Sequence, residues 1–203
     1  MARPRTVSDA EILAAAREVF LSQGASASTS IIARRIGVSQ AALFKRFGTK
    51  QDLMMAALRP PAEPPWVPAV HAGPDVSRPI EPQLRELSLE MLRFLVGMVP
   101  AMMVLSTCGI QPKVLLEEHE IPPPIIAQRA VAAWLARGMD AGLVRRAEPA
   151  HLALTWMGAL HVRAFFSSLT GLPLTEADIA SHVDAVVDSL WLGLAPAPIE
   201  ASP

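Results

Sequence analysis

Apolar residues recur at helical spacing along most of the chain, and no segment keeps the alternation typical of a strand. Over residues 8–23 they fall three or four apart, on one face of a helix: Ile12, Ala15, Ala16, Val19 and Phe20. Ser8 is a good N-terminal cap for this helix, and Gly24 can end it. The pattern predicts an all-α protein.

Three short helices are expected next, over residues 29–36, 40–47 and from residue 50 to Pro60. Each follows a hydroxyl residue that can cap its first turn, namely Ser28, Ser39 and Thr49. Glycines separate the three helices, so the turns between them are short.

Prolines interrupt the helical pattern after residue 59. Eight of the 19 prolines fall within residues 60–82, a density that predicts a linker or an irregular surface loop without a helix. We therefore expect three regions: a domain over 1–59, this Pro-rich segment over 60–82, and a helical domain over 83–203.

Longer apolar helices are predicted in the last region, over residues 83–98, from Pro100 onward, and over 124–142, 149–169 and 176–194. Residues 94–112 form a run of 19 residues without a charge, which is long enough to span a membrane or to form a buried helix pair. Pro100 and the small polar residues around it favour the buried pair, so no membrane contact is expected.

Charge is distributed unevenly, although the net charge is only −1. Residues 1–59 hold nine Lys and Arg against four Asp and Glu, a net charge of +5, and the remainder carries −6. This split indicates a basic head that meets a polyanion, or chance patchiness. The single cysteine, Cys108, excludes an intrachain disulfide, and a reducing, cytoplasmic location is expected.

Two short helices joined by a Gly-containing turn, within a basic domain, form the helix-turn-helix pattern. In that motif the first helix braces the second, which lies in the major groove of DNA. A small apolar wedge is expected to set the angle between the two helices: Ile32, Ile36, Val38 and Leu43. A generic helical hairpin is the alternative, and the charge of the head favours DNA.

The segment from Ser28 to Leu53, STSIIARRIGVSQAALFKRFGTKQDL, resembles the signature of the tetracycline-repressor (TetR) family. The resemblance covers residues 8–58 closely, and beyond them rests on size and helical character. It implies an N-terminal helix-turn-helix domain followed by a helical domain for effector binding and dimerisation. Two departures are Ala41-Ala42, where Gly-Thr or Gly-Ser is common, and Phe44 in place of the usual tyrosine.

The expected DNA contacts fall into two groups. Lys50 matches the family's phosphate-clamping lysine. Other phosphate contacts are expected from three arginines and from the capping residues at the helix starts: Arg3, Arg5 and Arg46, with Ser28, Ser39 and Thr49. Base reading is expected from Ser30, Gln40, Ala41, Phe44 and Lys45. Gln40 can pair with adenine, whereas Phe44 is alternatively a core residue.

The resemblance also implies a homodimer through the last two long helices. The final helix carries an apolar stripe for this contact: Ile179, Val183, Val186, Val187, Leu190, Trp191 and Leu194. The alternative is an ordinary intrachain core. Two heads about one DNA turn apart would then read a palindromic operator in double-stranded DNA.

A cavity for a small apolar effector is a further implication of the resemblance. Soft or amphipathic side chains in apolar segments are the candidates for its lining: Met98, Met102, Met103, Cys108, Trp134, Met157 and His161. A methionine-rich core without a ligand, with His161 as a satisfied core histidine, is the alternative.

Catalysis is not expected, because the chain has no nucleophile elbow, phosphate loop or dinucleotide fingerprint. The sequence Glu117-Glu118-His119-Glu120 lacks a second metal ligand one turn away. We therefore expect no catalytic residues, no metal site and no cofactor. The sequence predicts a ligand-responsive repressor, and a DNA-binding regulator controlled by a protein partner is the alternative.

Overall fold

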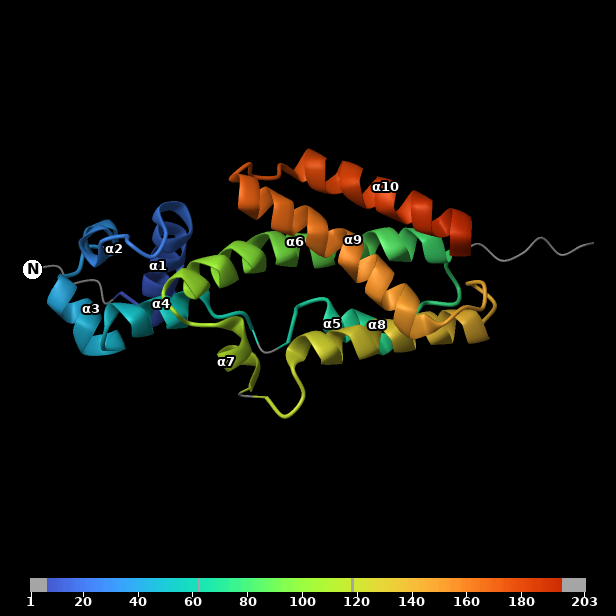
Figure 1. Cartoon of the computed structure of the whole chain (residues 1–203), viewed down its shortest axis with the longest axis horizontal. Helices are drawn as coiled ribbons and strands as arrows, with labels where there is room; N and C mark the ends of the chain where they lie inside the picture. Colours follow the sequence, from blue (N-terminus) through green and yellow to red (C-terminus); the bar gives the residue numbers. More distant parts are fainter. Residues whose placement is uncertain (1–6, 62, 118, 195–203) are drawn as a thin grey trace, which may run out of the picture. The chain divides into compact units, whose positions relative to one another are not determined.

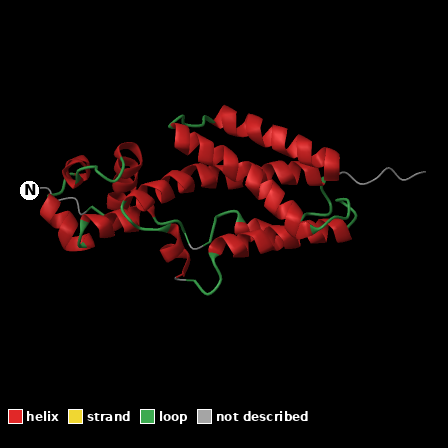
Figure 2. Cartoon of the chain, viewed as in Figure 1, coloured by secondary structure: helices red, strands yellow, loops and turns green. Residues whose placement is uncertain are grey.

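The computed structural model describes residues 7–61, 63–117 and 119–194, and the description leaves out the side chains of Pro112 and Leu194. Helices and loops make up these described ranges, with no strand among them (Figure 2). The chain divides into two compact units. Unit 1 contains the described residues of 1–60 and 100–118, and unit 2 those of 61–99 and 119–203.

Unit 1 is built on four short helices: α1 (Asp9–Gln23), α2 (Thr29–Ile36), α3 (Gln40–Phe47) and α4 (Lys50–Leu58). The apolar face predicted for the first helix is buried, with Phe20 and Ala16 fully inside. α1 packs against α2 and α4, and α3 packs against both α2 and α4. The predicted caps are confirmed, because Ser8, Ser28, Ser39 and Thr49 each accept a hydrogen bond from their helix's first turn.

Unit 2 is a bundle of longer helices: most of α6 (Ile80–Thr107), with α8 (Pro123–Asp140), α9 (Pro149–Thr170) and α10 (Glu176–Leu194) (Figure 1). α8 packs against α9, and α9 against α10. Trp134 and Trp156 lie at the centre with ring centroids 6.0 Å apart, and the indole Nε1 of Trp156 donates to the buried Ser88 hydroxyl at 2.8 Å. Arg85 of α6 joins Asp184 and Asp188 of α10 in ion pairs, which hold the two helices together.

The Pro-rich segment contains a short helix, α5 (Val67–Ala72), where none was predicted. That prediction was wrong because Pro68 lies in the first turn, where the missing N–H has no partner to lose. Burial of Val67 and Val70 holds the helix in the core of unit 2. Arg137 of α8 donates to the Val70 carbonyl at 2.7 Å, beside Gly73, where any Cβ would lie 2.9 Å from the Arg137 Nε.

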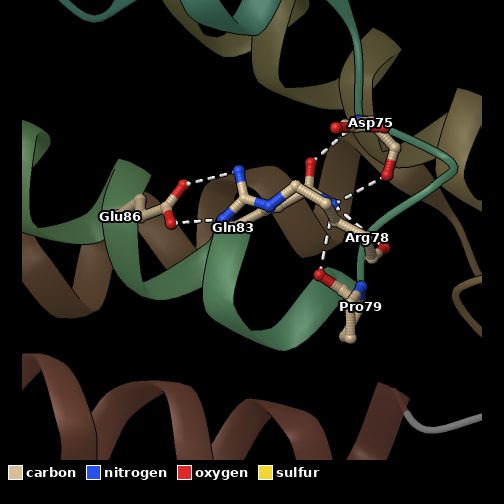
Figure 3. A network of polar contacts seen from close by, with 5 residues as sticks. All are labelled: Asp75, Arg78, Pro79, Gln83 and Glu86. Carbon is tan, nitrogen blue, oxygen red and sulfur yellow. Dashed lines mark hydrogen bonds and ion pairs between the residues drawn. The ribbon is translucent and has the colours of Figure 1, made fainter.

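A polar network orders the end of this segment (Figure 3). Buried Gln83 donates from Nε2 to the Asp75 carbonyl at 2.9 Å and accepts the Asp75 amide on Oε1 at 2.8 Å. Arg78 pairs with Glu86 through both terminal nitrogens, and this pairing raises the pKa of the guanidinium. Residues 61 and 63–82 thus belong to unit 2. The functional division into a head, a linker and a body stays a prediction.

Two predicted helices, 83–98 and the one from Pro100, are a single helix, α6 (Ile80–Thr107). Pro100 lacks the N–H that would bond the Val96 carbonyl, yet the helix continues because Ala101 and Leu105 are fully buried in unit 1. A further short helix that was not predicted, α7 (Pro112–Glu117), buries Leu115 in the same core. Within the described residues α6 alone is long and apolar enough to span a membrane, and its buried residues in both cores make it a core helix.

Candidate nucleic-acid interface

A three-residue turn joins α2 to α3 and sets the start of the second helix. Gly37 ends α2 with a φ of 76°, in the left-handed region that a glycine adopts without strain. The Val38 amide returns to the Ala33 carbonyl at 3.0 Å, which closes the end of α2. Ser39 then caps α3 through the Ala42 amide at 3.1 Å. The turn has the length that a helix-turn-helix requires.

The predicted wedge between the two helices is present. Ile32 and Leu43 are fully buried, and Ile36 and Val38 pack against the same core. Burying Leu43 on one side of α3 leaves the opposite side of this two-turn helix facing outward. One side of α3 is therefore anchored in the core, and its opposite side is exposed.

The outer face of α3 holds most of the residues predicted to read bases. Gln40, Ala41 and Lys45 are exposed, whereas Phe44 is half-buried. Ser30 of α2 is half-buried, and its hydroxyl lies 2.7 Å from that of Ser28. Their contacts with bases remain predictions.

Two predicted DNA contacts already have protein partners. Arg46 donates to the Val7 carbonyl at 2.6 Å and pairs with Asp9 at 3.0 Å, so it joins the end of α3 to the beginning of α1. Gln40 donates from Nε2 to the Thr29 hydroxyl at 2.5 Å. Arg35 of α2 pairs with Glu18 of α1.

A capping box begins α4. Thr49 accepts the Asp52 amide at 3.1 Å, and the Asp52 carboxylate accepts the Thr49 hydroxyl at 2.7 Å and amide at 2.9 Å. These bonds from the hydroxyl and the amide lower the pKa of Asp52. A Thr49 hydroxyl that contacts DNA as predicted must therefore also serve this cap. Lys50, the first residue of α4, is half-buried beside it.

Arg3 and Arg5, the predicted N-terminal arm, lie outside the described residues. We call the remaining candidate contacts the α2–α3 surface, which consists of Ser28, Ser30, Ser39, Gln40, Ala41, Phe44, Lys45, Thr49 and Lys50.

The predicted effector residues divide between the two units. Met102 and Cys108 pack on the core of unit 1, where the Cys108 Sγ lies 3.3 Å from the Met54 Sδ. Met98, Trp134 and Met157 belong to the core of unit 2, and Met103 is half-buried in the unit 1 part of α6. No single unit collects the whole set.

His161 is exposed, which corrects the idea of a buried imidazole. Its Nδ1 lies 2.9 Å from the Met157 carbonyl one turn earlier in α9, so it donates there.

Three residues of the stripe expected to form the dimer contact lie in the chain's own core. Ile179, Val183 and Val187 are 3%, 1% and 0% exposed. Val186, Leu190 and Trp191 pack on the same core, and the Leu194 side chain lies outside the described residues. The three buried residues fit the alternative of an intrachain core. A dimer contact that uses the half-buried Val186, Leu190 and Trp191 stays a prediction.

Two features escaped the sequence analysis. α9 carries large apolar residues on its outer face, namely Leu154, Val162, Phe165, Phe166 and Leu169. The spacing of three or four residues from Val162 onward could have indicated this outer apolar face. It was not recognised because the opposite face of α9 is apolar too. The second feature is Trp66, 4% exposed, whose indole Nε1 is buried without a hydrogen-bond partner in the described structure.

A basic helix-turn-helix unit followed by a larger helical unit defines a class: the DNA-binding transcriptional regulators. Residues 12–57 match the family model described as bacterial regulatory proteins, tetR family. Over these residues the chain carries the tetR-family segment, and over the rest solved TetR-family structures share its fold. Regulators of the TetR family bind DNA, form dimers and typically respond to ligands.

Solved structures share the fold over nearly the whole chain. A putative TetR-family regulator from Mesorhizobium loti is 18% identical with a TM-score of 0.64, covering 92% of this chain and 96% of its own. A TetR-family regulator from Pseudomonas syringae is 19% identical with a TM-score of 0.59, covering 93% and 99%. The flavonoid-responsive regulator FrrA is 21% identical with a TM-score of 0.51, covering 92% and 96%. No curated protein matches the sequence.

Proposed function

We propose that the protein is a homodimeric repressor that binds a palindromic operator through the α2–α3 surface and leaves it when a small apolar effector binds. The observation that carries this proposal is the outer face of α3. Gln40, Ala41 and Lys45 are exposed there while Leu43 anchors the helix from within. A helix of this kind fits the major groove.

The charge of the head supports DNA as the partner. The net charge of +5 over residues 1–59 attracts the phosphate backbone, and the free amides at the starts of α2 and α3 favour anions. Phosphate contacts then set the position of α3, and base contacts select the sequence. We place this activity in the cytoplasm, where the DNA is.

The outer face of α9 supports a homodimer. Leu154, Val162, Phe165 and Leu169 are between 47% and 60% exposed, and they lie along one side of the helix. Contiguous exposed apolar surface of this kind is typical of an interface. Two-fold pairing through one surface would present two copies of α3 to a palindrome.

Trp66 supports an effector that carries a hydrogen-bond acceptor. A buried donor without a partner destabilises a protein by about 1–3 kcal/mol, and a ligand oxygen beside the indole Nε1 would remove that cost. The surrounding core is apolar, so the rest of the ligand would be apolar too. FrrA, with the same fold, is named for its response to flavonoids.

The proposed release is a shift of population. An effector that binds more tightly to a conformation unfit for the operator weakens DNA binding by the ratio of its two affinities. Repression follows from occupancy of the operator by the effector-free dimer.

Binding to DNA is tested by fluorescence anisotropy with the full chain and labelled duplex or single-stranded oligonucleotides at low ionic strength. We expect duplex binding whose logarithm of affinity falls linearly with the logarithm of salt concentration. Indifference to every duplex would contradict the proposal.

Effector binding is tested by thermal shift against apolar ring compounds with and without a carbonyl. We expect carbonyl compounds to raise the unfolding temperature and to release DNA, and Trp66→Phe to weaken both effects while keeping the ring. No response to any compound would instead favour control by a protein partner.

A further inference from the structure

Thr29 and Gln40 meet where α2 and α3 both begin. Each is the first residue of its helix, and the Gln40 Nε2 lies 2.5 Å from the Thr29 Oγ1. Thr29 is 4% exposed, whereas Gln40 is exposed on the outer face of α3. A buried hydroxyl thus holds the side chain of a surface residue on the predicted DNA-reading face.

This bond decides which atoms of Gln40 remain for DNA. A primary amide has two N–H bonds and one oxygen, and the donation to Thr29 occupies one N–H. The second N–H and the Oε1 oxygen have no other hydrogen bond in the described structure, and they lie side by side when Thr29 takes the N–H anti to Oε1. Gln40 therefore presents one donor next to one acceptor.

Adenine is the base that matches this edge. In the major groove it presents the N7 acceptor beside the N6 amine donor, and guanine presents two acceptors, N7 and O6. An amide whose free edge is one donor and one acceptor pairs with both groups of adenine. With guanine, the Oε1 oxygen would face the O6 oxygen without a proton between them.

We propose that Thr29 is a positioning residue that fixes the Gln40 amide so that α3 selects adenine at one operator position. The inference rests on the proposed function, because it requires α3 to enter the major groove. Thr29 acts through Gln40 and needs no contact with the base. The side chain is held before DNA arrives, so less freedom is lost on binding.

The experiment begins with selection of preferred duplexes from a random library by the wild-type chain. Gln40→Ala identifies the position that Gln40 reads, since only there should the preference relax. Binding is then measured on duplexes carrying adenine, guanine, 7-deazaadenine, which lacks N7, or purine, which lacks the N6 amine, at that position.

For the wild type, we expect each replacement to weaken binding by about 5- to 150-fold. Thr29→Val keeps the shape of the side chain but removes the hydroxyl, and should reduce this discrimination to within about twofold of none, as Gln40→Ala should. Thr29→Ser, which retains the hydroxyl, should restore it. Affinity for unrelated duplexes and the helix content by circular dichroism should stay unchanged, which separates positioning from a loss of folding.

Three outcomes would overturn the inference. Thr29→Val could discriminate as strongly as the wild type, or Thr29→Ser could behave like Thr29→Val. Selection of guanine at the Gln40 position would show that the amide presents two donors rather than one donor and one acceptor. In all three cases a selected site would leave the proposed function standing, whereas failure to select any duplex would overturn both.

Discussion

Lys50 is the first residue of α4, beside the capping box and at the edge of the α2–α3 surface. Its ammonium should contact a phosphate, which contributes affinity without sequence preference. Lys50→Ala should therefore weaken binding to all duplexes alike and reduce the slope of log affinity against log salt by about one. Anisotropy titrations over a range of salt concentrations measure both quantities.

Lys113 provides the matched control for that titration. It is an exposed lysine of α7, paired with Glu117 at 3.4 Å and remote in sequence from the α2–α3 surface. Lys113→Ala should leave the slope unchanged. An unchanged slope for Lys50→Ala as well would remove Lys50 from the phosphate contacts.

The stability of the cap at the start of α4 depends on pH through Asp52. Since the bonds from Thr49 lower the pKa of Asp52 in the folded chain, the ionised form stabilises the cap. This stabilisation is fully present above the unfolded value of about 3.9 and is lost as the pH falls through the lower folded value. A carboxyl ¹³C NMR titration should place the Asp52 midpoint below 3.9, and Thr49→Val should move it upward. Equal midpoints in both proteins would contradict this account of the cap.

Helix boundaries were predictable wherever a capping residue or a glycine marks them. Ser28 and Gly37 bound α2, and Ser39 and Gly48 bound α3, so local chemistry alone placed both helices. At prolines, by contrast, the sequence predicted helix ends or loops where the structure has helices. Pro68 lies in the first turn of α5, and packing of Ala101 and Leu105 carries α6 past Pro100. Tertiary packing overrides propensity at such positions, and sequence spacing alone does not reveal it.

Pairings between distant residues were the part of the site that the sequence could not supply. The candidate DNA-reading residues follow from their place in the helix-turn-helix pattern. By contrast, the bonds of Gln40 to Thr29 and of Arg46 to Asp9 depend on how the helices pack. The same holds for α10, where spacing identified an apolar stripe but not which surface covers it.

At the scale of the whole molecule, the exposed face of α9 is expected to join two copies. Phe165 is 47% and Leu169 is 57% exposed, so Phe165→Glu with Leu169→Glu places two charges in the proposed interface without disturbing the core. We expect the variant to sediment as a monomer at micromolar concentration, where the wild type is a dimer. Its affinity for a palindromic duplex should fall toward that for a single half-site.

Val76→Glu is the control for that variant, since Val76 is an apolar residue of a loop and is 68% exposed. It should remain dimeric. A wild-type chain that sediments as a monomer, or a double variant that stays dimeric, would show that α9 is not the interface.

The most direct test of the account is the selection of duplexes from a random library by the purified full chain. We predict enrichment of an inverted repeat whose half-sites are about 10 base pairs apart, centre to centre, or a multiple of that spacing. Recovery of sequences without any shared half-site, with equal retention of every duplex, would contradict the claim that α3 reads DNA.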